Sequence, residues 1–132
     1  MRRFAQSIRL LPEKEAEYIR YHENVWPEVL QTIADCGIRN YSIFLSGGVL
    51  FAYFEYHGSD FAGDMRKMAA CPHTQRWWSI TDAMQSPIED AEPGEKWSVM
   101  REVFHFDPKE GATFPVLNGL GSSVGSEVDR DA

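Results

Sequence analysis

Two pairs of side chains in this sequence have the types and the spacing that ligand binding or proton transfer requires. Tyr18 and His22 are four residues apart, so in a helix they stand one turn from each other on the same face. Trp77 and Trp78 are adjacent and diverge by about 100° around a helix, so one can fill the core while the other lines a cavity. Taken alone, either pair is more often ordinary core packing than a binding site.

A third aromatic residue belongs with these pairs. Tyr41 shares the more apolar face of its predicted strand with Ile43 and Leu45, so it should point towards the helices and meet Tyr18 and His22. Aromatic rings stack on the C–H faces of sugars, while phenols and an imidazole hydrogen-bond hydroxyl groups. The set therefore favours a neutral, hydroxyl-rich ligand with an apolar face.

The elements that must position these residues follow from hydrophobic periodicity and from the prolines and glycines that bound it. Strands are predicted at residues 3–10, 40–45, 49–56 and 97–106, and a polar loop at residues 86–96. Helices are predicted at residues 12–24 and 27–36, and from residue 61 onwards with a reset at Pro72 before residues 73–84. The order β-α-β-β-α-β predicts the α+β ferredoxin-like fold, an antiparallel sheet with helices on one face.

The strand at residues 49–56 adds an expectation about assembly. Its sequence, VLFAYFEY, is apolar on both faces, whereas a sheet with one face in water should alternate apolar and polar residues. A second copy of the chain, packed sheet to sheet across a two-fold axis, is the simplest cover for the outer face. We therefore expect a homodimer.

Composition excludes several classes of partner. The chain has 132 residues and 13 Lys plus Arg against 20 Asp plus Glu, a net charge of −7, which argues against nucleic acid and against anionic membranes. No apolar run approaches the roughly 20 residues that span a bilayer, and no signal peptide is recognisable. Cys36 and Cys71 form no disulfide framework, and neither they nor the four histidines have metal-ligand spacing. We expect a reduced, cytoplasmic protein without a metal site.

The composition changes near residue 109. Residues 1–108 are rich in aromatics and contain all four Trp and all four His, whereas residues 109–132 are rich in Gly and Ser and contain only one aromatic residue. We therefore expect one domain at residues 1–108 and a flexible tail at residues 109–132, whose removal should leave assembly and activity intact.

Four segments carry a resemblance to a known family. In this order and spacing, the sequences YIRYHENVWPE, NYSIFL, QRWW and EVFHFD resemble those of the L-rhamnose mutarotase family, over about residues 2–107. The resemblance implies a dimeric α/β-barrel arrangement of ferredoxin-like domains. It also implies interconversion of the α and β anomers of a 6-deoxy-L-sugar, a reaction that requires no metal or organic cofactor.

The resemblance also assigns roles to individual positions. His22 falls on the proton-donor histidine of the family, and a histidine suits that role because its unperturbed pKa is about 6.5. Tyr18, Tyr41, Trp77 and Trp78 fall on positions that contact the sugar. Asp82 matches a recurrent acidic position without an assigned role. The general base stays open between Tyr41, a water molecule and His22 acting in both roles.

One segment departs from the family pattern. Members usually continue after the Trp pair with a short Asn/Asp-rich run that ends in Ser-Pro, whereas this chain reads SPIEDAEPGEKWSVM. The departure leaves the sugar open between L-rhamnose and L-fucose.

Two other function classes fit the same predicted fold, because function depends on the site rather than on the fold. Dimeric ferredoxin-like proteins include haem-degrading and cofactor-free monooxygenases. A Soret absorbance band on addition of haem would favour this alternative. A non-catalytic sugar-binding module would bind the sugar without accelerating anomer exchange.

Overall fold

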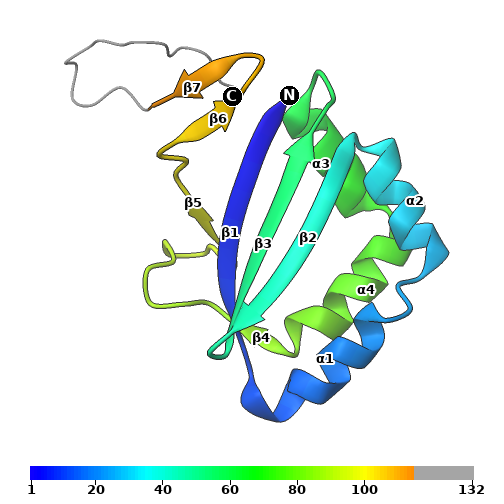
Figure 1. Cartoon of the computed structure of the whole chain (residues 1–132). Coiled ribbons are helices and arrows are strands. Elements are labelled where there is room, and N and C mark those ends of the chain that lie inside the picture. Colours follow the sequence, from blue (N-terminus) through cyan, green and yellow to red (C-terminus); the bar gives the residue numbers. More distant parts are fainter. Residues whose placement is uncertain (115–132) are drawn as a thin grey trace.

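The computed structural model describes residues 1–114 and has the predicted ferredoxin-like α+β architecture (Figure 1). The main sheet is antiparallel, with strand order β2-β3-β1-β4, and β5 pairs with the same edge of β1 as β4 does. Its strands are β1 (Arg2–Leu10), β2 (Ile38–Ser46), β3 (Val49–Tyr56), β4 (Gln85–Ser86) and β5 (Ser98–Met100). One face is covered by a 3₁₀ turn (Pro12–Lys14) and by α1 (Glu15–His22), α2 (Pro27–Asp35), α3 (Phe61–Ala70) and α4 (Pro72–Asp82).

Alternating residues of the two central strands form the base of the core. Ile8 of β1 pairs with Leu50 of β3, and both side chains point towards the helices with 1% of their surface exposed. Leu10, Met84 and Tyr18 complete this buried cluster. Because Tyr18 belongs to α1, the cluster fixes the position of this helix on the sheet, and with it the position of His22.

A β-bulge in β2 determines which of its side chains face the helices. The register with β3 shifts between Arg39 and Ser42, so Asn40 and Tyr41 together stand opposite Phe54. Asn40 has a φ of 52°, the left-handed conformation that bulges use. In a regular strand, residues 38 and 41 would point to opposite faces. Because of the extra residue, Ile38 and Tyr41 both face the helices. The predicted inward direction of Tyr41 is confirmed.

The predicted last strand at residues 97–106 is wrong. Only Ser98–Met100 pair with β1, and His105–Asp107 (β6) instead form a hairpin with Gly111–Thr113 (β7). The register that pairs Ala5 with Met100 would place Val103 opposite Arg2, the first residue of β1, so residues beyond Val103 have no β1 residue to pair with. Periodicity detects the strand-like sequence of this segment but not the end of its partner.

The hairpin also bears on the predicted domain boundary. β7 lies after residue 108, so secondary structure continues into the segment predicted as a tail. The hairpin lies beside the N-terminal end of β1 (Figure 1). Residues 115–132, the rest of that segment, lie outside the described residues.

The outer face of the sheet carries an apolar patch. Phe44 and Phe51 are paired across β2 and β3, and 62% and 38% of their surfaces are exposed. Met100, on the neighbouring edge, is also exposed. Within residues 1–114 no helix is long and apolar enough to cross a membrane.

Candidate active site

A cavity of about 580 Å³ lies between the helices and the inner face of the sheet. All five residues predicted for the site line it: Tyr18, His22, Tyr41, Trp77 and Trp78. They come from α1, β2 and α4, so three separate segments of the chain converge on one space. Cavities of this size, with mostly apolar walls and a few polar groups, are typical of small-molecule sites.

His22 is held in one orientation by its own helix. Its Nδ1 lies 2.8 Å from the main-chain carbonyl oxygen of Tyr18, and its ring stacks on the Tyr18 ring with 4.1 Å between centroids. Because a carbonyl only accepts hydrogen bonds, Nδ1 carries the proton. In the neutral ring Nε2 therefore has the free lone pair, and it is the nitrogen available to a ligand.

Burial sets the charge of this histidine. Burial lowers the pKa of His22 below its ordinary value of 6.5, while the hydrogen bond to the Tyr18 carbonyl opposes the shift. The imidazole is therefore mainly neutral at pH 7. A neutral ring with a lone pair on Nε2 accepts a proton first and donates it afterwards.

The pKa values of the two phenols shift in the opposite direction, upwards. Burial is the main cause that raises the pKa of Tyr18, assisted by the nearby Tyr41 and opposed by a side-chain hydrogen bond with Gln85. Burial also raises the pKa of Tyr41; 42% of this residue is accessible, but its phenol lies among the walls of the cavity. Both phenols therefore stay protonated at neutral pH and can donate hydrogen bonds.

The two tryptophans divide their roles as the sequence predicts. Only 6% of Trp77 is exposed, and its ring makes edge contacts with Trp26, His22 and Tyr21 at centroid distances of 5.1, 5.3 and 5.9 Å. In contrast, 40% of Trp78 is exposed, although it lines the same cavity. Trp77 thus fixes the packing around His22, and Trp78 offers an accessible aromatic face.

Several polar residues that sequence reasoning missed also line the cavity. They are Gln6, Thr74, Thr81, Gln85 and Lys96. Gln6 had a detectable signal, because it lies on the same face of β1 as Phe4 and Ile8. Lys96 had none, since a lysine in a polar loop is normally solvent-exposed. Lys96 forms an ion pair of 2.5 Å with Asp82, the acidic position noted in the sequence.

Among residues 1–114, no group of three or more His, Cys, Asp or Glu side chains is placed to hold a metal ion. The other three histidines, His57, His73 and His105, do not line the cavity. The chemistry that the site offers is therefore that of one imidazole, two phenols, amides and an ion pair.

Comparison with known proteins identifies the family. Residues 3–106 match a family model described as L-rhamnose mutarotase. The chain belongs to the L-rhamnose mutarotase family. The prediction of family membership, and with it of an isomerase, is confirmed.

Relatives of this L-rhamnose mutarotase family member span most of its length. An L-rhamnose mutarotase of Acidiphilium cryptum is 35% identical over 107 residues, covering 80% of this chain and 98% of that protein. A UPF0734 protein of Dictyostelium discoideum is 35% identical over 111 residues, covering 79% of this chain and 89% of that protein. The crystal structure of an L-rhamnose mutarotase from Formosa agariphila aligns with a TM-score of 0.63 at 23% identity, over 81% of this chain and all of that one. The last similarity supports the fold.

The division between the tryptophans makes a testable prediction. Trp77→Ala should lower the free energy of unfolding by about 3–5 kcal/mol, because it removes a buried ring. Trp78→Ala should change stability by only about 0.5 kcal/mol, because the ring is partly exposed, but should weaken sugar binding. Denaturant unfolding and saturation-transfer NMR measure the two effects. Trp78→Phe keeps an aromatic face and should retain most of the affinity; equal losses of stability in Trp77→Ala and Trp78→Ala would contradict the division.

Proposed function

We propose that this protein interconverts the α and β anomers of a 6-deoxy-L-sugar, L-rhamnose or L-fucose, with His22 as the proton-transferring group. The observation that carries the proposal is the orientation of His22. Its Nδ1 is tied to the Tyr18 carbonyl within a cavity that also holds two phenols and an accessible tryptophan. These groups suit a neutral sugar, because the C–H face of its ring stacks on aromatic side chains and its hydroxyl groups form hydrogen bonds.

The walls of the cavity suit the 6-deoxy position. Phe54, Met65 and Ile38 contribute apolar surface to it, in addition to the polar groups. A methyl group at C6 would meet these walls without leaving a polar atom unpaired. A hydroxyl at C6, as in glucose, would cost roughly 1–3 kcal/mol if it found no partner there.

The reaction opens and recloses the pyranose ring. The anomeric hydroxyl loses its proton, its oxygen becomes the aldehyde oxygen, the bond between C1 and the ring oxygen breaks, and the ring oxygen gains a proton. Rotation about the C1–C2 bond then presents the other face of the aldehyde carbon. Reclosure reverses each proton movement, so no net proton or electron is exchanged.

His22 fits both proton-transfer roles in this sequence. As a neutral base, Nε2 takes the proton of the anomeric hydroxyl, and as an imidazolium it gives a proton to the ring oxygen. Tyr41 is a poor base at neutral pH because burial raises the pKa of its phenol. We therefore assign hydrogen-bond donation to Tyr18 and Tyr41, and contact with the sugar to Trp78 and Trp77.

We also propose that the protein acts as a homodimer in the cytoplasm. Phe44 and Phe51 form a paired apolar patch on the outer face of the sheet, and Phe104 and Phe106 of the following segment are more than half exposed. A second copy would cover these surfaces with like surfaces across a two-fold axis. Cys36 is a free thiol, as is usual in a reducing compartment.

Exchange NMR tests the proposed reaction and the role of His22. The protein should accelerate anomer exchange of L-rhamnose or L-fucose, and of D-glucose much less. His22→Asn should reduce the enhancement by roughly 10²–10⁴-fold, the usual contribution of general acid–base catalysis. Tyr18→Phe should reduce it by about tenfold or less, because it removes one hydrogen bond and keeps the ring. His57→Asn, a change at an exposed histidine outside the cavity, is the matched control. Undiminished exchange in His22→Asn would refute the assignment.

The pH dependence should show which protonation state begins the reaction. The pKa of His22 is lowered from 6.5, and its neutral form is the proposed base. The value of kcat/KM should therefore be constant above pH 6.5. It should fall as the pH decreases through the lowered pKa. Exchange rates with and without protein, measured at each pH, give this profile. A rate that instead falls as the pH rises through the same range would show that the imidazolium is the starting form.

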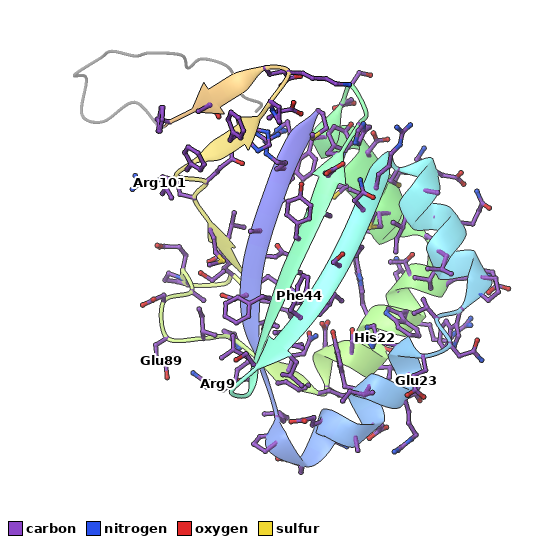
Figure 2. The ribbon with its side chains drawn as sticks, in the orientation of Figure 1. Arg9, His22, Glu23, Phe44, Glu89 and Arg101 are labelled. Carbon is purple, nitrogen blue, oxygen red and sulfur yellow. The ribbon has the colours of Figure 1, made fainter. Side chains whose placement is uncertain are left out.

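The dimer is tested by sedimentation velocity at micromolar concentration. The expected mass is twice the 15.1 kDa of the chain. Phe44→Lys should yield a monomer, because it places a charge within the apolar patch that Phe44 and Phe51 form. Phe44 lies on β2 and is labelled in Figure 2. A stable wild-type monomer would contradict the proposed assembly.

A further inference from the structure

The segment between β4 and β5, residues 87–97, forms part of the cavity wall. Both strands pair with β1, so the chain leaves this edge of the sheet after Ser86 and returns to it at Ser98. Trp97 anchors the returning end, because its ring packs against the core cluster that contains Ile8 and Leu10. The residue before this anchor, Lys96, therefore stands at a defined place beside the cavity.

Lys96 meets a carboxylate from α4. Its Nζ donates a hydrogen bond to Oδ2 of Asp82 at 2.5 Å, and both residues line the cavity. Asp82 is the last residue of α4 and lies four residues after Trp78, one helical turn along the same face. A carboxylate, an ammonium group and an accessible indole are thus next to one another at one end of the site.

An exposed ion pair contributes little to the stability of a fold. The side chains of Lys96 and Asp82 are 60% and 38% exposed, so stability alone gives a weak reason for their position. The same segment has a second ion pair, Arg9–Glu89, at 2.8 Å, which fastens it to β1 outside the cavity. Figure 2 shows Arg9 and Glu89 together, away from His22.

From this arrangement we infer that Lys96 and Asp82 bind the hydroxyl groups of the sugar and select its configuration; the inference rests on the proposed function. The ammonium group donates and the carboxylate accepts, so a hydroxyl beside the pair, in contact with both groups, makes two charge-assisted hydrogen bonds in a fixed direction. Sugars that differ only in hydroxyl stereochemistry present this hydroxyl differently. The pair therefore discriminates between them, while His22 performs the proton transfer.

The test compares variants of the Lys96–Asp82 pair, which lines the cavity, with a variant of the Arg9–Glu89 pair, which lies outside it. Lys96→Met and Asp82→Asn remove the charges and keep the side-chain lengths, and Glu89→Gln breaks the outer pair of the same segment. In Lys96→Met and Asp82→Asn the affinity for the preferred sugar should fall about tenfold, the loss expected for a charged hydrogen bond. The preference between L-rhamnose and L-fucose should decrease. Glu89→Gln should change none of these quantities.

Deoxy sugars identify the hydroxyl concerned. The 2-, 3- and 4-deoxy analogues of the preferred sugar should each be titrated by saturation-transfer NMR against wild type and Lys96→Met. One analogue should bind wild type more weakly and lose no further affinity in the variant, because the same hydrogen bond is already absent. If all analogues lose affinity equally in the variant, or if Glu89→Gln matches Lys96→Met, the pair only fastens the segment and the inference is overturned.

Binding and exchange separate this inference from the function on which it rests. A wild-type protein that binds the sugars without accelerating exchange refutes the catalytic proposal, while the affinities still decide whether Lys96 and Asp82 select the sugar. A wild-type protein that binds neither L-rhamnose nor L-fucose overturns both.

Discussion

The hydrogen bond between His22 Nδ1 and the Tyr18 carbonyl links the fold to the chemistry of this protein. The carbonyl lies within α1, one helical turn before His22, where the side chain four residues later can reach it. Tyr18 is itself part of the buried cluster on the sheet, so the acceptor is as fixed as the core. Its effect is to choose the tautomer of the imidazole, and the tautomer decides which nitrogen a ligand meets.

The aromatic side chains explain why this region contains a cavity rather than a closed core. Trp77 packs edge-on against Trp26, Tyr21 and His22, and such contacts keep the rings apart as well as in place. On the sheet, Tyr41 leans against Phe54 at a centroid distance of 5.7 Å. The space between these two groups of rings is enclosed enough to shift the pKa of an imidazole and a phenol in opposite directions, which keeps both of them neutral.

Local spacing predicted much of the site, and long-range pairing determined what was missed. The Tyr18–His22 pair and the divergence of Trp77 from Trp78 depend only on helix geometry, so four residues on two helices were correctly grouped. Tyr41 was assigned to the correct face because its neighbours in the strand alternate. The extent of β5 could not be predicted, since pairing with β1 stops at Met100 although the strand-like sequence continues to Phe106. Lys96 could not be predicted either, because its position comes from the packing of Trp97 and from a carboxylate on another element.

The bulge at Asn40 has a consequence for how the length of β2 can change. The strand consists of two stretches whose inward and outward positions are out of phase by one residue, and Asn40 is the spacer that keeps both in phase with the helices. Deletion of this residue would restore a regular strand and leave both faces as they are. Deletion further along, for example of Phe44, would instead turn over the residues between the bulge and the deleted position, exchanging ligand-facing side chains for solvent-facing ones. Deletions in this strand are therefore absorbed at the bulge and not within the regular stretch that follows it.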